Sequence, residues 1–353
     1  MASKNATLKD VAELAGVSTA TVARVLHDNG YVADITRQQV LEAVAQTGYR
    51  INVIAQGLRK QRTFTIGHFL NSLFPNPFFV EVAAGVEQAA LAKGYTVLIF
   101  NVQQSAEQER RGIELFIQRR VDAIIFTTPQ SAENVELALR EGILVVQIER
   151  PMPVVSNAVL VDQYTGAIEA MEHLIALGHR QIAFWGEKPK SVIPSSAQWC
   201  NVELDRFTGY TDTLKKHRLP IQNDVIFLQD HYPTNANENA QQGDQIVSKL
   251  LRARPDCTAI FAASDLMAAS VLQSLYKRGL HVPRDMSVIG FDNTLSAHLT
   301  PPLTTVALPM LEMGSEAVRI IVEHLDTENT SAHSVSTLTA RLIARDSTGK
   351  AQK

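Results

Sequence analysis

Cysteine is scarce in this sequence, which contains only Cys200 and Cys257, far apart in the chain. Two distant cysteines give neither the clustered spacing of a zinc site nor a disulfide framework. No apolar run approaches the roughly 18 residues that a membrane-spanning helix needs. The N-terminal segment MASKNATLKD is polar and has no apolar signal region. We therefore expect a cytoplasmic protein with no bound metal and no membrane partner.

The motifs of several common enzyme classes are also absent. The sequence has no G-x-S-x-G nucleophile turn, no P-loop, no G-x-G-x-x-G segment and no H-E-x-x-H pair. Its ten histidines show no metal-ligand spacing, and His68, inside the apolar segment TIGHFL, is expected to pack or to line a cleft. We therefore expect no catalytic residue, no cofactor and no enzymatic activity.

The net charge of −3 hides an uneven distribution. Residues 1–63 contain eight basic and five acidic residues, whereas residues 64–353 contain 25 basic and 31 acidic residues. A basic segment on an acidic body is typical of a protein whose basic part contacts a polyanion, although chance could also produce it. The length of 353 residues indicates two or three folding units.

Residues 8–26, LKDVAELAGVSTATVARVL, have the pattern of two short helices that meet at Gly16. Thr7 and Asp10 form an N-cap signature for the first helix, and Ser18 can cap the second. The second helix has small residues at its start and few large apolar residues. This composition suits a helix whose backbone approaches base edges in the major groove of DNA. The alternative is a small helical bundle without a special purpose, which would make a poor independent core.

A third helix is predicted to begin at Thr36, because Thr36 and Gln39 form a capping box, and to end at Gly48. The connector that follows is basic and polar, and it resembles a hinge more than a core element. We therefore expect a helix-turn-helix domain at residues 1–50 and a hinge at residues 51–63.

From Phe64 onward, strand-like apolar runs alternate with helical segments. The predicted strands cover residues 65–70, 96–100, 122–127, 143–148, 158–162, 181–185, 225–229, 258–263 and 286–291. This alternation predicts parallel sheets with helices on both faces, and two such series predict two α/β lobes. Ligands of such sheets bind beyond the carboxyl ends of the strands. We place the lobes in a core at residues 64–345, the first at about 64–162 and 292–325 and the second at about 163–291 and 326–345.

The whole sequence resembles the LacI/GalR family of bacterial transcription regulators. The resemblance is carried by TLKDVAELAGVSTATVARVL, VADITRQQVLEAVAQTGY and NVIAQGLR, and in the core by NPFFVEVAAGVEQAALAKGY, EHLIALGHRQIAF, RFTGY and SDLMAASVLQSLYKRGLHVPRDMSVIGFDN. It implies an all-α helix-turn-helix head, a hinge helix, and a bilobed α/β core similar to periplasmic sugar-binding proteins. It also implies a repressor of a catabolic operon. Such a repressor binds a near-palindromic operator as a homodimer under the allosteric control of a small sugar or sugar derivative.

The resemblance assigns DNA contacts to residues of the head. Thr19, Ala20 and Arg24 match base-reading positions. The guanidinium of Arg24 can bridge two acceptors on guanine, and a solvated surface arginine is the alternative. Ala23 replaces the family's usual serine, so one phosphate contact is expected to be missing. The positions that match phosphate contacts are Thr7, Ser18, Thr21, His27, Tyr31, Thr36 and Arg37.

The hinge positions that match the family are Asn52, Ile54, Ala55, Gln56 and Leu58. The resemblance implies that Leu58 wedges into the minor groove at the operator centre, with ordinary packing onto the core as the alternative. Ile51 stands where proline is common in the family, and Gly57 lowers the helix propensity of this segment. We therefore expect a hinge helix that forms only on the operator.

For the effector, the resemblance points to Arg206 in DRFTGY and Asp292 in VIGFDN. A capping role for Asp292 and a salt bridge between Arg206 and a carboxylate are the alternatives. Asp265 is expected to cap a helix, and residues 186–201 form a segment longer than the family pattern. Further effector candidates are Glu149, Asn71, Phe78, which could instead pack in a helix core, and Ser264, which replaces an asparagine found in some relatives.

Two other functions remain open from the sequence alone. The chain could be a sugar-binding module whose N-terminal bundle is incidental, or an α/β enzyme without a role on DNA. Salt-dependent DNA binding would argue against the first, and the absence of turnover of candidate sugars would argue against the second.

Overall fold

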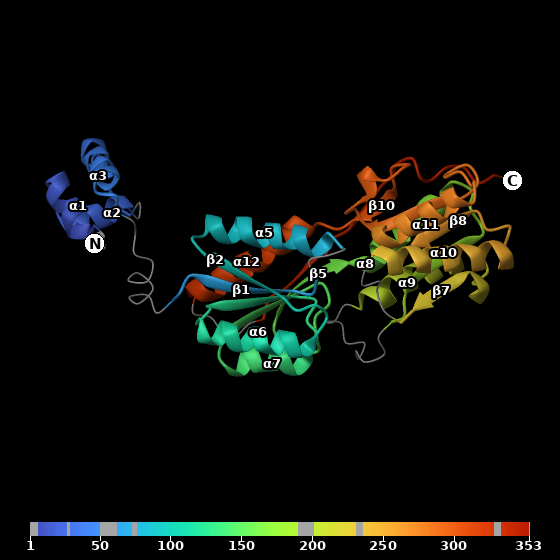
Figure 1. Ribbon diagram of the computed structural model, residues 1–353, viewed down its shortest axis with the longest axis horizontal. Helices are drawn as coiled ribbons and strands as arrows, with labels where there is room; N and C mark the ends of the chain where they lie inside the picture. Colours follow the sequence, from blue (N-terminus) through green and yellow to red (C-terminus); the bar gives the residue numbers. More distant parts are fainter. Residues whose placement is uncertain are drawn as a thin grey trace. The chain divides into compact units, whose positions relative to one another are not determined.

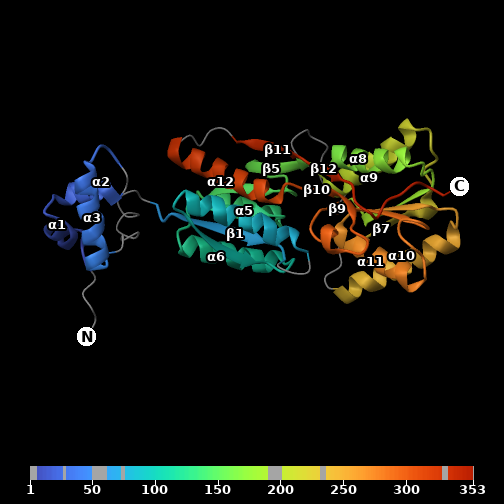
Figure 2. The same ribbon diagram turned by 90° about the horizontal axis from the view of Figure 1, so that it is seen from above.

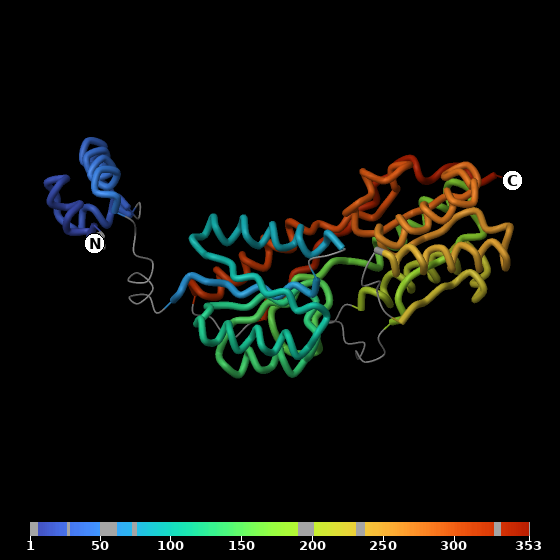
Figure 3. The backbone as a smooth tube through the Cα atoms, viewed as in Figure 1, coloured from blue at the N-terminus to red at the C-terminus, as the bar shows by residue number. Residues whose placement is uncertain are grey.

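The computed structural model describes residues 6–26, 29–49, 62–72, 76–189, 201–230, 236–327 and 333–352. The chain divides into two compact units, Met1–Thr63 and Phe64–Lys353. We call the described helical part of the first unit, residues 6–49, the head, and the second unit the core (Figures 1 and 3). Within the described residues, no helix combines the length and the apolar character needed to cross a membrane.

Three helices pack together in the described part of the head: α1 (Leu8–Ala15), α2 (Thr19–Leu26) and α3 (Asp34–Thr47). On α2, Val22 and Val25 are buried, whereas Thr19, Ala20 and Arg24 are exposed. The outer face of α2 therefore carries two small side chains and one guanidinium. The buried side chains of the head are Val11, Ala12, Val22, Val25, Val40 and Ala43.

The predicted caps of the first two helices are confirmed. The Thr7 hydroxyl accepts from the Asp10 N–H at 3.3 Å, and the Asp10 carboxylate accepts from the Thr7 N–H at 2.7 Å. The Ser18 hydroxyl accepts from the Thr21 N–H at 3.1 Å. These bonds satisfy backbone donors that the first turn of a helix leaves unpaired.

The predicted capping box of the third helix is wrong. α3 begins at Asp34, its N-cap Ala33 has no side-chain cap, and Thr36 lies inside the first turn. The carboxylate of Asp34 in the first turn stabilises the earlier start, because it interacts favourably with the positive end of the helix dipole. Gly48 ends the helix with φ of 64°, as expected.

The first lobe of the core is a parallel sheet with strand order β11-β5-β4-β3-β1-β2. The strands are β1 (Thr65–Leu70), β2 (Thr96–Asn101), β3 (Ala123–Thr127), β4 (Leu144–Ile148), β5 (Asn157–Asp162) and β11 (Val335–Thr339). The helices α5 (Phe78–Ala92) and α12 (Met310–Thr327) cover one face, and α6 (Ala106–Gln118) and α7 (Ala132–Arg140) cover the other (Figure 1).

The second lobe has strand order β12-β10-β9-β8-β6-β7. The strands are β6 (Ile182–Glu187), β7 (Ile226–Gln229), β8 (Ala259–Ala262), β9 (Ser287–Asp292), β10 (Thr304–Ala307) and β12 (Arg341–Ile343), of which β12 is antiparallel to β10. The helices α8 (Gln163–Ala176) and α9 (Val202–Lys216) lie on one face, and α10 (Ala236–Ala253) and α11 (Asp265–Lys277) lie on the other (Figure 2). Two short 3-10 helices are η1 (Asn223–Val225) and η2 (Ser296–His298). The head and the two lobes confirm the predicted fold class.

The chain passes between the lobes after β5, between β10 and α12, and between β11 and β12. Residues 292–307, which the sequence assigned to the first lobe, therefore lie in the second. The strand β11, which the sequence assigned to the second lobe, lies in the first. This boundary was wrong because β10 and β11 are short and rich in threonine and serine and β12 has only three residues, so they lack the apolar runs of the other strands.

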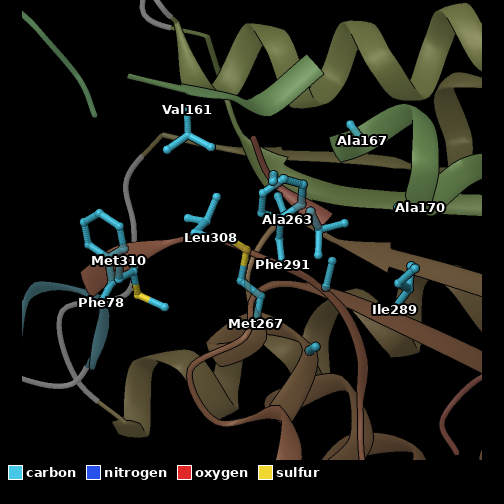
Figure 4. Close-up of a cluster of buried hydrophobic side chains, with 14 of the residues drawn as sticks. Phe78, Val161, Ala167, Ala170, Ala263, Met267, Ile289, Phe291, Leu308 and Met310 are labelled. Carbon is cyan, nitrogen blue, oxygen red and sulfur yellow. The ribbon is translucent and has the colours of Figure 1, made fainter. Parts of the chain in front are cut away.

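One cluster of buried apolar side chains extends through both lobes, and another lies within the first lobe. Phe78 and Met310 of the first lobe lie in this cluster with Met267 and Phe291 of the second (Figure 4). The cluster also contains Leu308, in the segment that joins the lobes between β10 and α12. The charged groups described below therefore lie next to buried apolar side chains of both lobes.

Candidate functional site

The exposed face of α2 is the first candidate site. Thr19 and Ala20 are exposed at the start of the helix, and Arg24 is exposed one turn later on the same face. Helical spacing brings residues four positions apart onto one face. Small side chains let a backbone come close to a partner, and the guanidinium supplies several hydrogen-bond donors. The face can therefore come close to a partner and donate hydrogen bonds to acceptor groups on it.

Most of the expected phosphate-binding residues lie in the described part of the head. Thr7, Ser18 and Thr21 take part in the helix caps and remain at least partly exposed. The side chain of Tyr31 is 93% exposed, and Thr36 and Arg37 lie at the beginning of α3. The expected contacts outside the described residues are His27, Asn52, Ile54, Ala55, Gln56 and Leu58.

The second candidate site lies between the lobes of the core. Arg206, on α9 of the second lobe, donates from Nη2 to Asp292 Oδ1 at 3.2 Å. The same nitrogen lies 3.9 Å from Oε1 of Glu149, which follows β4 of the first lobe. All three side chains are almost completely buried. The structure therefore brings together three of the expected effector residues, in the arginine–carboxylate salt bridge that the sequence left open.

Further contacts fix the position of the Arg206 guanidinium. Its Nε donates to Gln163 Oε1 at 3.0 Å, and its Nη1 donates to the carbonyl oxygen of Ala263. Its central carbon lies 4.0 Å from the centroid of the Phe291 ring. These contacts pair donors that would otherwise be costly to bury and hold the guanidinium in one plane.

Asp292 is the last residue of β9 and has a left-handed backbone with φ of 103°. Burial raises the pKa of its carboxyl to about 8, because a charged carboxylate is costly in an apolar surrounding. The charge of Arg206 acts in the opposite direction, while the nearby carboxylates of Asp265 and Glu149 raise the pKa further. Asp292 therefore gives up its proton far less readily than an exposed aspartate.

The sequence did not predict the role of Arg150, which connects the two lobes. Its Nε donates to Glu203 Oε1, on α9, at 2.9 Å, and its Nη1 donates to Glu149 Oε2 at 3.0 Å. Burial alone would lower the pKa of Arg150, but the negative charges of its neighbours, Glu149 first, raise it overall. For Glu203, burial raises the pKa, but the charges of Arg150 and Arg206 lower it overall.

Two arginines and two glutamates line a small pocket between the lobes. Its free volume of about 10 Å³ is roughly what one water molecule needs. Charged groups form one part of its wall and apolar side chains form the rest, a combination that suits a small polar molecule with an apolar face. The lining residues are Arg150, Phe184, Glu187, Val202, Glu203, Arg206, Ala263 and Met267. Arg150 and Glu187 each lie at a strand end, so the strand-end rule applied to β4 and β6 would have identified them.

The other expected effector residues have different surroundings. Asn71 follows β1, and its Oδ1 is buried with no hydrogen-bond partner among the described residues. Phe78 is 2% exposed and packs in the core near Met310, which agrees with the packing alternative (Figure 4). Ser264 is fully buried, and its hydroxyl caps α11 by accepting from the Met267 N–H at 3.2 Å.

Asp265 and His68 are two further residues for which an expectation came from the sequence. Asp265 does not cap α11: its carboxylate accepts from the Thr305 hydroxyl at 2.6 Å and from the Thr294 N–H at 2.8 Å, so it fixes the turn that follows Asp292. This expectation was wrong because the preceding Ser264 caps the helix. His68 is packed, as expected: it is fully buried and hydrogen-bonded to Thr127 at 2.8 Å, and burial lowers its pKa to about 3. Most of the long segment 186–201 lies outside the described residues.

Comparisons with known proteins cover both candidate sites. Residues 7–52 match the family described as bacterial regulatory proteins, lacI family, and residues 171–348 match a periplasmic binding protein-like domain. Catabolite control protein A of Priestia megaterium is 33% identical over 349 residues, which cover 98% of this chain and 99% of that protein.

Two similar solved structures cover almost the whole chain. The Lac repressor dimer bound to operator and the anti-inducer ONPF has a TM-score of 0.75 and 26% identity, and covers 98% of this chain and 100% of its own. The transcriptional regulator CelR–cellobiose complex has a TM-score of 0.69 and 28% identity, and covers 97% of this chain and 99% of its own. The chain therefore belongs to the lacI family of bacterial regulatory proteins.

Proposed function

We propose that this protein is a sequence-specific DNA-binding transcriptional regulator, a repressor of a catabolic operon, and that a sugar-like molecule bound between its lobes controls its affinity for DNA. The observation that carries the proposal is the presence in one chain of the exposed α2 face and the Arg206–Asp292–Glu149 cluster between two lobes. The relatives support it, since one solved relative is a dimer on operator DNA and another is a complex with cellobiose.

On the DNA side, the exposed face of α2 enters the major groove. Arg24 donates to guanine, and Thr19 and Ala20 let the helix approach the base edges. The residues that match phosphate-binding positions bind the DNA backbone and fix the register of the head on the duplex. Two heads of a homodimer bind the two halves of a near-palindromic operator, because a twofold dimer presents the same surface twice.

The hinge belongs to the proposal through its sequence alone, since residues 52–58 lie outside the described part of the chain. Leu58 and its dimer mate wedge into the minor groove at the operator centre, and Asn52, Ile54, Ala55 and Gln56 match the other hinge positions of the family. Unstacking a base step costs a few kcal/mol, which the contacts of two bound heads offset.

On the effector side, a ligand between the lobes contacts residues of both, so it stabilises one arrangement of the lobes over another. Without it, the ion pairs of Arg150 with Glu203 and of Arg206 with Glu149 connect the lobes directly. A ligand that breaks these pairs changes the lobe arrangement and, through the hinges, the spacing of the heads. A coupling free energy of about 1–3 kcal/mol changes operator affinity about 5- to 150-fold.

The regulator acts on genomic DNA, so we place it in the cytoplasm. None of its residues is assigned a catalytic role, and the polar groups of the pocket serve to bind a ligand. This distinguishes the proposal from a sugar-binding module without a DNA role and from an α/β enzyme.

The proposal is tested by measuring the affinity of the purified protein for genomic fragments at increasing salt concentration. We expect a subset of fragments to bind above random duplex DNA, with the logarithm of the affinity falling linearly with the logarithm of the salt concentration. Equal, weak affinity for every fragment would leave the chain a sugar-binding module. Conversion of a sugar that depends on Asp292 would make it an enzyme.

A further inference from the structure

The turn that follows β9 has a backbone conformation that most side chains avoid. Asp292 and Asn293 are both left-handed, with φ of 103° and 64°. Such a conformation is uncommon for residues other than glycine, and it persists only where the surroundings hold it. The same turn presents the carboxyl of Asp292 to Arg206, which donates to Oδ1 at 3.2 Å. The position of this carboxyl therefore depends on the contacts that hold the turn.

Asp265, the first residue of α11, holds the turn on one side. Its Oδ2 accepts from the Thr294 N–H at 2.8 Å, and its Oδ1 accepts from the hydroxyl of Thr305, on β10, at 2.6 Å. The strand β9 leaves room for this carboxylate because residue 290 is a glycine, where any Cβ would clash with Oδ1 of Asp265. Asp265 is fully buried, so these bonds are shielded from competing water.

Arg345, in the segment after β12, holds the turn through a second set of contacts. Its Nη2 donates to Asn293 Oδ1 at 2.8 Å. Its Nη1 donates to the Ser296 hydroxyl at 2.9 Å and to the carbonyl oxygen of Leu303 at 2.8 Å. The Ser296 hydroxyl in turn donates to Asn293 Oδ1 at 2.7 Å. A planar guanidinium that reaches three acceptors at once fixes their relative positions.

The second sheet fixes Arg345 itself. Its backbone N–H donates to the Thr304 hydroxyl at 2.9 Å. Two residues later, the hydroxyl of Ser347 accepts from the Thr304 N–H at 2.7 Å and donates to the carbonyl oxygen of Val288 at 2.6 Å. Ser347 is fully buried between β9 and β10. The guanidinium therefore extends from a backbone that is bonded to the same two strands that enclose the turn.

The turn is also bonded to the segment that joins the lobes. The carbonyl oxygen of Asp292 accepts from the N–H of Leu308, which lies between β10 and α12, at 3.2 Å. The side chain of Asp292 contacts Arg206, and its main chain contacts the connection to the first lobe. A displacement of this turn would therefore move the carboxyl away from Arg206 and disturb the connection between the lobes.

We propose that Arg345 and Asn293 are positioning residues of the effector site, which together with Asp265 hold the left-handed turn so that the Asp292 carboxyl stays on Arg206. Neither Arg345 nor Asn293 belongs to the lining of the pocket that the described residues form, so both act through Asp292 and not on the ligand. This inference rests on the proposed function only in that it takes Asp292 as an effector-binding residue.

The variant Arg345→Met tests the inference in the full-length protein without any ligand. Nuclear magnetic resonance of protein labelled with [γ-¹³C]aspartate measures the pKa of the Asp292 carboxyl, whose signal is the one that disappears in Asp292→Asn. Burial is the largest cause that raises this pKa to about 8, so release of the turn into water should lower it toward 3.8. The charges that act on this carboxyl are those of Arg206, Asp265, Glu149 and Arg150. A lower pKa in Arg345→Met therefore reports a displaced carboxyl and not a lost charge.

The matched control is Arg341→Met, the same charge change at an exposed position of β12, which should leave the pKa of Asp292 unchanged. A second pair of variants covers the case that circular dichroism shows Arg345→Met to be unfolded. Asn293→Gly removes the shared acceptor, and glycine adopts φ of 64° without strain, so a purely structural role predicts no loss of stability and no change in the pKa of Asp292. The inference predicts a lower pKa in Asn293→Gly. It also predicts that Asn293→Asp, which keeps the acceptor, has a pKa at or above that of the wild type.

The consequence for the effector is measured by calorimetry with glucose, galactose, mannose, ribose and cellobiose. For the sugar of this panel that binds the wild type most tightly, we expect Arg345→Met and Asn293→Gly to weaken binding about 10- to 100-fold, the range for a lost charge-assisted hydrogen bond. Arg341→Met and Asn293→Asp should bind this sugar as the wild type does. A general loss of folding would instead weaken binding together with the content of secondary structure.

The outcomes separate this inference from the proposed function. An Asp292 pKa that is unchanged in Arg345→Met and Asn293→Gly overturns the inference and leaves the effector pocket in place. A lowered pKa with unchanged sugar affinity overturns it as well, because the turn would then not matter to the ligand. If no sugar of the panel binds the wild type, the sugar-responsive pocket of the proposed function is contradicted, while the pKa comparison still decides whether Arg345 and Asn293 hold the carboxyl.

Discussion

The variant Arg206→Met tests how the pocket between the lobes is stabilised. Methionine keeps most of the length of the arginine stem and removes the guanidinium. The change deletes the bonds to Asp292, to Gln163 and to the carbonyl oxygen of Ala263. It leaves Asp292 and the nearby Glu149 as buried acidic groups without this counter-charge.

Removing one partner of a buried ion pair costs about 3–5 kcal/mol. A domain of the size of the core loses about 2–4 °C in melting temperature for each kcal/mol, so we expect a decrease of about 6–20 °C. Thermal unfolding of the full-length protein, followed by circular dichroism, measures this decrease. Arg252→Met, at an exposed position of α10, is the matched control, and a surface change of this kind stays within about 0.5 kcal/mol.

The pH dependence of this loss is a second part of the same prediction. Burial raises the pKa of Asp292 to about 8 even with Arg206 beside it, so at pH 6 the carboxyl is protonated in both proteins. Above pH 8 the wild-type carboxyl ionises beside Arg206, whereas the variant has no such counter-charge. The difference in unfolding free energy should therefore increase from pH 6 to pH 9. A melting temperature within 2 °C of the wild type (less than about 1 kcal/mol), or a difference that shrinks with pH, would refute this reasoning.

Three other changes address different parts of the molecule. Arg24→Ala should abolish the preference for operator over random DNA in gel shifts while ligand-induced stabilisation remains; loss of both would mean that the fold has failed. Gly314→Ala should lower the unfolding free energy by about 1–3 kcal/mol, because its new Cβ would clash with the carbonyl oxygen of Val82. An unchanged melting temperature would show that the helices α5 and α12 can move apart. Asp292→Asn should flatten the pH dependence of stability. The raised pKa of Asp292 means that the stability it contributes is complete below pH 3.8 and is lost as the pH rises to about 8. Unfolding at pH 4, 6 and 8 that gives parallel curves for both proteins would contradict this.

Most strands of the core could be predicted from sequence because they are buried on both faces. Segments such as TIGHFL and DAIIFT are continuous apolar runs, which is typical of parallel strands covered by helices. The strands β11 and β12 could not be predicted in this way. They are separated only by Ala340 and belong to different sheets, so no local pattern distinguishes them. Only the packing of the whole core assigns them to their lobes.

The residues of the site that a single sequence segment identifies could be predicted. Arg206 and Asp292 followed from a motif, and Glu149 followed from its position after a strand. Arg150 and Glu203 could not be identified as partners from sequence, because they are 53 positions apart and meet only when the lobes come together.

The most direct test of the account is the affinity of one operator with and without one effector. Fragments selected from the genome supply the operator, and the sugar that stabilises the core most supplies the ligand. We expect saturating ligand to change the operator affinity of the full-length protein about 5- to 150-fold, because the two sites are coupled by about 1–3 kcal/mol. Equal affinity in its presence and absence would show that the core does not control the head, and would contradict the account.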